Sequence, residues 1–422
     1  MPRWMLVALV IALGALRPDA SAGQTMLLQL PVACGEPTCP ERRLAVSLDP
    51  LGVTGERLVA PGSLPTYVTP DGRFGVALRY GNGAPSVFVV SDFVTGGSFD
   101  VAVPGVAAFI GNPARTELYT ADASGVMAVS TGGLRRLVNF ACGTAGATPE
   151  AISADGTRVA FRCGWPGPVN VFDTTSGALV GTVAALSALS ADGSHGYVVD
   201  GFPVMLRRIE VATGTEVAQV ALTPAAGSGT VVVDPRTGNV LLQEGEFFGA
   251  RLFDPALQFL RTAVSAGQGR WTFDPSRARA YTASGRWFEG GFGGAPTYSF
   301  TVGTIDTEQW VSAGSATAAN FTCCVGVGYA FPPAAPTSLA ATVTGNAVSL
   351  SWTASVPAAS VVRYVLEAGS ASGVANIATF DLGLQTSLAV GGVPPGTYYV
   401  RVRAMNYAGA SLPSNEVVVF VP

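Results

Sequence analysis

Aromatic residues recur in short glycine-containing segments along the chain, and these residues are well suited to binding a ligand. The segments span residues 79–84 (RYGNGA), 163–168 (CGWPGP), 200–203 (DGFP), 244–249 (EGEFFG) and 284–296 (SGRWFEGGFGGAP). A flat ring beside a few charged groups can stack against a sugar or an extended peptide. The candidate ligand-binding residues are Tyr80, Trp165, Phe202, Phe247, Phe248, Arg286, Trp287 and Phe288. The alternative is that these rings only pack on neighbouring parts of the fold.

Catalysis would need other groups, of which the chain holds few. Two rim carboxylates, Glu244 and Glu289, are the candidates for a pair acting across a glycosidic bond, which requires a separation of about 5 to 9 Å. Nothing in the sequence positions them. The single histidine, His195, excludes a three-histidine zinc site, and the absence of lysine excludes Schiff-base chemistry. We therefore expect no catalytic centre, no metal site and no cofactor. The net charge of -4, without a basic block, excludes a nucleic-acid partner.

A repeated turn shows which elements position these segments. Residues 152–177 read as three short strands, with an Asp155-Gly156 turn after the first and a Thr-Thr-Ser-Gly turn after the last. Related turns occur at 68–73, 111–115, 190–193, 233–238 and 273–277. Their spacing of about 37 to 43 residues is the period of a four-stranded propeller blade. The aromatic segments then all fall between the second and third strands of their blades, on one face of the ring. His195 falls on the opposite face, as a surface or cross-strand histidine.

These turns also carry a family resemblance. The motifs PDGR and ADGTR, followed by VFVVSD or VFDTTSG, resemble the YVTN-type repeats of secreted bacterial β-propellers over roughly residues 40 to 331. Six repeats run from about Leu64 to Ser312. Segments 43–49 and 56–59 match the third and fourth strands of a further blade, and 316–331 would supply its first two. We expect seven blades, with six as the alternative.

The C-terminal part follows a different pattern. After a proline-rich linker at 332–336 the strands lengthen, and 347–352 reads as a buried strand ending on Trp352. Residues 337–422 resemble a fibronectin type III domain, an immunoglobulin-like β-sandwich, with Tyr398 at the tyrosine-corner position. The resemblance implies a spacer or docking unit.

The N-terminus and the cysteines indicate export. Residues 1–22 read as a signal peptide, with an apolar core at 5–16 that is too short to span a bilayer and a small-residue cleavage motif at 20–22. Cys142 and Cys163 lie at strand ends that an antiparallel pair brings together, so we expect a disulfide between them. The pairing of Cys34, Cys39, Cys323 and Cys324 stays open: local bridges, a cross-link between the propeller ends, or a four-thiolate zinc site.

The sequence thus predicts an all-β chain: signal peptide 1–22, β-propeller 23–331, linker 332–336 and fibronectin type III domain 337–422. We expect a secreted or periplasmic, monomeric, non-enzymatic binding or scaffold protein without a membrane span. Its expected partner is a glycan, peptidoglycan or protein at the cell surface. The alternative is a polysaccharide-active hydrolase or lyase.

Overall fold

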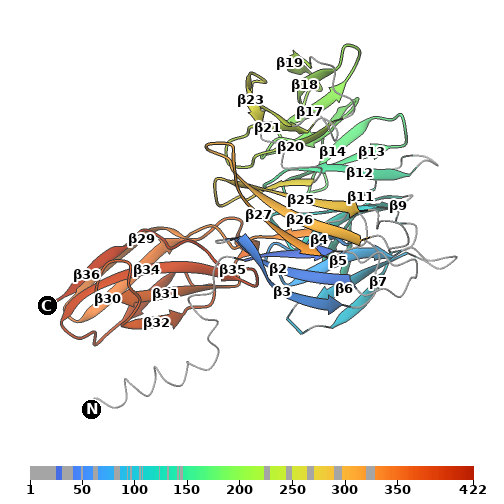
Figure 1. Ribbon diagram of the computed structural model, residues 1–422. Coiled ribbons are helices and arrows are strands. Elements are labelled where there is room, and N and C mark those ends of the chain that lie inside the picture. Colours follow the sequence, from blue (N-terminus) through green and yellow to red (C-terminus); the bar gives the residue numbers. More distant parts are fainter. Residues whose placement is uncertain are drawn as a thin grey trace.

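The structure is a computed structural model that describes residues 25–30, 41–48, 51–59, 65–79, 86–92, 94–95, 97–103, 106, 108–122, 124–130, 133–139, 142, 146–222, 229–243, 250–263, 270–288, 297–319 and 328–422. All regular elements are strands apart from one short 3-10 helix, within this described part. A ring of sheets occupies most of the chain, and a smaller β-sandwich stands on one side of it (Figure 1).

Six antiparallel sheets are each built from four consecutive strands and are named blades 1 to 6 in chain order. Their strands are β4 (Pro65–Val68), β5 (Phe74–Arg79), β6 (Val87–Asp92) and β7 (Ser98–Ala102); β8 (Phe109–Gly111), β9 (Glu117–Asp122), β10 (Gly125–Ser130) and β11 (Gly133–Asn139); β12 (Ala147–Ile152), β13 (Arg158–Cys163), β14 (Val169–Asp173) and β15 (Leu179–Val183); β16 (Ala188–Leu189), β17 (His195–Asp200), β18 (Met205–Glu210) and β19 (Glu216–Ala221); β20 (Thr230–Val233), β21 (Val240–Gln243), β22 (Ala250–Phe253) and β23 (Phe259–Ala263); β24 (Arg270–Phe273), β25 (Arg279–Phe288), β26 (Thr297–Asp306) and β27 (Val311–Ala319).

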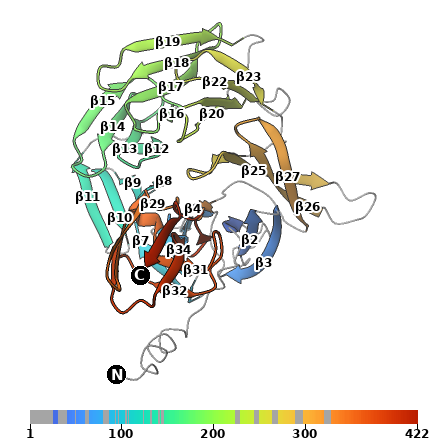
Figure 2. The same cartoon turned by 90° about the vertical axis from the view of Figure 1, so that its left-hand side faces the viewer.

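A seventh four-stranded sheet, the closing blade, joins the two ends of the ring (Figure 2). Its strand order is β28 (Gly328–Ala330), β1 (Thr25–Leu30), β2 (Glu41–Leu48) and β3 (Leu51–Val59). The prediction of a blade shared between the termini is confirmed, but the predicted share of each end was wrong. The C-terminal side supplies one strand and the N-terminal side three, because residues 316–319 extend β27 of blade 6 instead. Pairing of β28 with β1 in this blade links the C-terminal and N-terminal ends of the ring.

The predicted turn chemistry sets the start of the second strand in each blade. In blade 3, Ser153 Oγ donates to Asp155 Oδ1 at 2.6 Å, and the Thr157 amide donates to the same oxygen at 2.9 Å. Gly156 follows with a φ of 69°, a conformation that glycine adopts at no steric cost. A Cβ there would also lie 2.0 Å from Asn112 Oδ1 of blade 2. The turn is therefore also a contact between neighbouring blades.

The propeller core lies between adjacent blades rather than within any single sheet. One buried cluster joins blades 1 and 2, and others join blades 2 and 3, 3 and 4, 4 and 5, and 5 and 6. The third residue of the second strand is a fully buried tyrosine in three blades: Tyr119, Tyr197 and Tyr281. The fourth strands form the exposed rim, as in β7 and β11. Each blade thus depends on its neighbours for burial of its apolar residues.

The C-terminal sandwich begins at Thr337, after residues 332–336. One sheet contains β29 (Thr337–Thr344), β30 (Ala347–Thr353) and β33 (Ser387–Val390); the other contains β31 (Arg363–Gly369), β32 (Ala378–Asp381), β34 (Gly396–Asn406), β35 (Gly409–Ala410) and β36 (Val417–Val421), and the 3-10 helix spans Ala358–Ser360. Trp352 is 6% exposed and packs edge-on against Tyr364. The Tyr398 hydroxyl donates to the Pro394 carbonyl at 2.8 Å, which confirms the predicted tyrosine corner.

The sandwich is docked on the propeller through the turn between β34 and β35. Asn406 Nδ2 donates to the carbonyls of Phe331 at 2.8 Å and Pro70 at 3.3 Å. The Tyr407 amide donates to the Asp71 carbonyl at 3.0 Å. Pro70 and Asp71 belong to the turn between β4 and β5, so the sandwich covers the face of the ring that carries these first turns. Figure 2 looks onto this face and shows the sandwich over one sector of the ring.

Candidate functional site

The predicted aromatic segments at 163–168 and 200–203 lie on the face of the ring that the sandwich leaves free. Each of them follows the second strand of its blade, and the docked turn at Pro70–Asp71 precedes a second strand. Since the two ends of one strand lie on opposite sides of the ring, the loops between second and third strands are on the side away from the sandwich. We call this side the loop face.

The loop at residues 163–168 presents Trp165, whose side chain is 84% exposed. The loop itself is tightly folded: the Cys163 amide donates to the Pro168 carbonyl at 3.0 Å, and a Cβ on Gly167 would lie 1.7 Å from the Cys163 carbonyl oxygen. The Arg162 guanidinium lies 4.8 Å from the centre of the Trp165 ring. The position of the ring is therefore held by a cation–π contact and not by burial.

Arg162 is itself held in place by the adjoining strands. Arg162 is only 7% exposed. Its Nε donates to Glu150 Oε1 at 2.6 Å, and one of its terminal nitrogens donates to the Gly167 carbonyl at 3.1 Å. A buried guanidinium with a carboxylate partner is costly to remove, because the partner loses its compensation. Arg162 and Glu150 were not among the predicted site residues. Arg162 directly precedes this loop in the sequence, but nothing in the sequence indicates its pairing with Glu150, 12 residues earlier.

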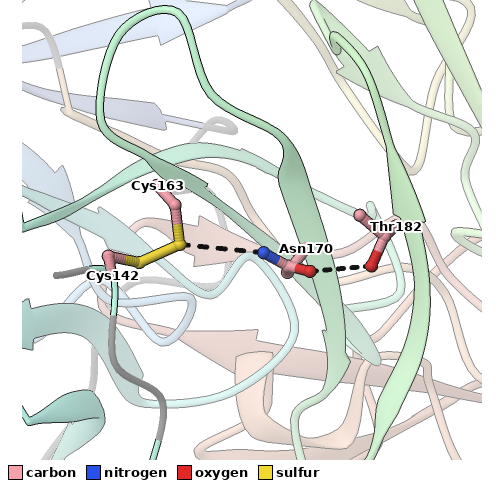
Figure 3. The surroundings of a disulfide bond; sticks show 4 residues. All are labelled: Cys142, Cys163, Asn170 and Thr182. Atoms are coloured by element: carbon pink, nitrogen blue, oxygen red, sulfur yellow. Dashed lines mark hydrogen bonds between the residues drawn. A yellow bond between two sulfur atoms is a disulfide. The ribbon is translucent and has the colours of Figure 1, made fainter.

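A disulfide fixes the base of the same loop. The predicted bridge between Cys142 and Cys163 is confirmed, with a Cα–Cα distance of 4.9 Å (Figure 3). Asn170 Nδ2 donates to Cys163 Sγ at 3.8 Å, and Thr182 Oγ1 donates to Asn170 Oδ1 at 2.7 Å. The bridge ties the connection that enters blade 3 to the loop that carries Trp165. Cys34, Cys39, Cys323 and Cys324 lie outside the described residues.

The neighbouring blade presents a second exposed ring. Phe202 lies between β17 and β18 and is 99% exposed. Close to it, Arg207 pairs with Asp200 at 2.8 Å and with Glu216 at 2.7 Å, and the hydrogen bonds that Arg207 donates to Glu216 and Asp200 raise its pKa. Blades 3 and 4 therefore each combine an exposed aromatic ring with an arginine–carboxylate group. For these two rings the alternative interpretation, packing on neighbouring structure, is wrong.

The structure describes only some of the other predicted site residues. Tyr80, Glu244, Phe247, Phe248 and Glu289 lie outside the described residues. The prediction that residues 284–288 belong to a loop is wrong. These residues extend β25, where Arg286 pairs with Ser299, Trp287 with Tyr298 and Phe288 with Thr297. β25 and β26 each run for 10 residues, longer than the second and third strands of the other blades. Their antiparallel ladder therefore continues through the residues that were expected to form the loop.

His195 lies at the start of β17, on the side of the ring that carries the sandwich. It is paired across the ladder with Glu210, and Ser194 Oγ lies 2.7 Å from its Nδ1. Burial and the nearby Arg208 lower its pKa, against the charges of Asp192 and Glu210. The equivalent ladder position in blade 3 is the Arg158–Asp173 ion pair. His195 thus fills a structural cross-strand position that other blades give to arginine.

Within the described part of the chain, no group of three or more His, Cys, Asp and Glu side chains is placed to hold a metal ion. In the same part, no helix has the length and apolar character needed to cross a membrane.

Comparison with known proteins agrees with the two-part fold. Residues 334–420 match the family model of the fibronectin type III domain. A solved protein from Lactobacillus plantarum is 13% identical, with 73% of this chain and 99% of that chain covered and a TM-score of 0.51. A putative 6-phosphogluconolactonase from Bacteroides uniformis is also 13% identical, covering 72% and 99% with a TM-score of 0.47. A fibronectin-type-III-like protein from Clostridium thermocellum is 28% identical over 21% of this chain and 94% of its own, with a TM-score of 0.19. No curated protein matches the chain.

These observations define an all-β protein of the propeller class. More closely, the chain is a β-propeller followed by a C-terminal domain that matches the fibronectin type III family model over residues 334–420.

Proposed function

We propose that this chain is an exported, non-enzymatic binding protein whose loop face recognises a glycan at the cell surface. The observation that carries the proposal is the exposure of Trp165 (84%) and Phe202 (99%) on adjacent blades. Scattered exposed apolar residues are common, but large rings at successive loop tips of one face are typical of a contact surface.

The surroundings of the two rings support a polar ligand rather than an apolar one. Arg162 with Glu150 and Arg207 with Asp200 supply cationic and carboxylate groups beside each ring. A sugar offers both an apolar ring face for stacking and hydroxyls for such groups to bind. An extended peptide would use the same groups less completely, because its backbone also requires a sheet edge or pocket.

The proposed test is a glycan and peptidoglycan array with the purified protein, repeated with Trp165→Ala and Phe202→Ala. Loss of one central stacking ring should cost about 2 kcal/mol, or about 30-fold in affinity. Phe420→Ala is the matched control, since Phe420 is 65% exposed on β36 of the other domain. A parallel array with Trp287→Ala/Phe288→Ala extends the test to the predicted residues of blade 6.

Three outcomes separate the proposals. Selective glycan binding that Trp165→Ala weakens and Phe420→Ala does not would support the loop face. Binding of peptides alone, or binding indifferent to both ring substitutions, would overturn it. Turnover of a bound polysaccharide that Glu244→Gln or Glu289→Gln abolishes would instead establish the hydrolase or lyase alternative.

A further inference from the structure

The opposite side of the ring contains a cavity that the loop-face function does not use. Its volume is about 460 Å³, and it lies where the first strands of the blades end, at the side that carries the sandwich. Val68, Ile152, Val233 and Phe273 line it from blades 1, 3, 5 and 6. This volume is within the roughly 300–1,000 Å³ range of small-molecule sites.

The second domain forms part of the cavity wall. Pro332, Pro333 and Ala334 of the linker line it, together with Val356 and Pro357 of the fibronectin type III domain. Pro332 and Pro333 are buried. The cavity is thus composite and would lose one wall if the domains separated.

Specific contacts hold that wall in place. Asn406 is 9% exposed, and its Nδ2 donates to the Phe331 carbonyl at 2.8 Å, immediately before the linker. Its Oδ1 accepts from the Ala408 amide at 2.9 Å, which fixes the side chain in its own turn. Ala408 in turn packs with Val68 and Ala330 in a buried apolar cluster across the domain boundary. The wall is therefore fixed by both polar and apolar contacts.

The chemistry of the lining selects the kind of ligand. Among the described lining residues none is charged, and the hydroxyl groups are those of Tyr67, Thr272 and Ser360. Tyr67 donates to the Asn112 carbonyl at 2.8 Å, and Ser360 donates to the Pro357 carbonyl at 2.7 Å. A charged ligand would find no opposite charge among these lining residues to compensate for its lost hydration. The lining fits a neutral, mainly apolar molecule.

We propose that this cavity binds a neutral, predominantly apolar small molecule, and that the docked fibronectin type III domain completes the site. Ligand binding then stabilises the docked arrangement of the two domains, since a ligand in contact with both favours the state in which both are present. The inference is independent of glycan binding, because the two sites lie on opposite sides of the ring.

The test uses N-phenyl-1-naphthylamine, a neutral probe whose fluorescence rises in an apolar environment, titrated with the purified protein. Val356 is the position to change: it lies at the cavity rim with 76% of its surface exposed, so substitution leaves the domain core intact. Val356→Arg should weaken probe binding at least about tenfold, because it places a charge at an apolar site. Val356→Leu should bind as the unchanged protein does. Val418→Arg, at a 61% exposed position on β36, is the matched charge control.

Asn406→Ala provides the second arm, because Asn406 does not itself line the cavity but holds the wall through its hydrogen bonds to Phe331 and Pro70. Weaker probe binding in this variant, together with unchanged binding in Val418→Arg, supports a composite site. The absence of saturable binding, or equal affinity in Val356→Arg and Val418→Arg, overturns the cavity as a binding site. Full affinity in Asn406→Ala, with domain separation shown by small-angle scattering, overturns the part assigned to the second domain.

Discussion

Removal of the disulfide between Cys142 and Cys163 should destabilise the propeller and loosen the loop that carries Trp165. The two cysteines are 21 residues apart in the sequence. On the chain-entropy model a closed loop of this size stabilises the folded state by about 3 kcal/mol. With a urea m-value of about 3 kcal/mol per M, the midpoint of unfolding should fall by about 1 M.

The double variant Cys142→Ser/Cys163→Ser measures this effect without leaving a single thiol to mispair. Unfolding in urea is followed by tryptophan fluorescence and by far-ultraviolet circular dichroism. Asn170→Ala is the control for side-chain hydrogen bonding, because it removes the bond to Cys163 Sγ with the bridge intact. That control should cost about 1 kcal/mol, a third of the effect of the bridge.

A second readout connects the bridge to the site. Because Cys163 ends β13 and begins the Trp165 loop, opening the bridge should increase hydrogen exchange at the amides of residues 163–168 more than elsewhere in blade 3. A midpoint within about 0.2 M of the unchanged protein would refute the entropic reasoning. Unchanged exchange in the loop would show that its backbone hydrogen bonds hold the loop without the bridge.

Three other substitutions test separate parts of the structure. Gly111→Ala places a Cβ 1.8 Å from the Tyr67 ring and should cost about 1–3 kcal/mol in thermal unfolding, whereas Gly97→Ala, with its nearest atom at 3.5 Å, should be neutral; equal melting temperatures would contradict this. Burial raises the pKa of Asp192, but hydrogen bonds from neighbouring serines outweigh it and bring the pKa to about 2. The stability that this carboxylate contributes is complete above its unfolded pKa of about 3.9 and is lost as the pH falls toward 2, so Asp192→Asn should reduce the acid-induced loss over that interval; identical pH profiles would exclude the effect. Asn406→Ala should separate the domains and increase the radius of gyration in small-angle scattering; an unchanged radius would assign the docking to the apolar contacts and the Tyr407–Asp71 backbone hydrogen bond.

Local chemistry made much of the fold predictable. The Asp-Gly turns mark the start of a second strand because a carboxylate caps the turn amide and glycine takes the positive φ, which are properties of four adjacent residues. The disulfide was predictable for a similar reason. Cys142 shortly precedes β12 and Cys163 ends β13, and these two consecutive strands pair with each other. Trp352 and Tyr398 identified the second domain in the same way.

Features that depend on distant contacts were not predictable. The share of each terminus in the closing blade depends on whether residues 316–319 extend β27 or begin a new blade, and both alternatives satisfy the same alternation of residues. The extension of β25 through Trp287 depends on its long pairing with β26. The glycine-rich sequence at 284–296 does not predict this pairing. Docking of Asn406 on Pro70 joins residues 336 positions apart.

The arrangement of the two domains gives the two faces of the ring different physical characters. The sandwich and linker cover one sector of the side on which the first turns lie, and they form part of the wall of an uncharged composite cavity there. The loop face carries no such cover and presents Trp165 and Phe202 beside paired charges. A neutral apolar ligand gains by leaving water for the first side, whereas a hydrated polar ligand can bind the second while keeping much of its hydration. The two proposed sites on this ring are therefore of opposite polarity, and the apolar one depends on the contacts of Asn406, Tyr407 and Ala408 that hold the second domain against the ring.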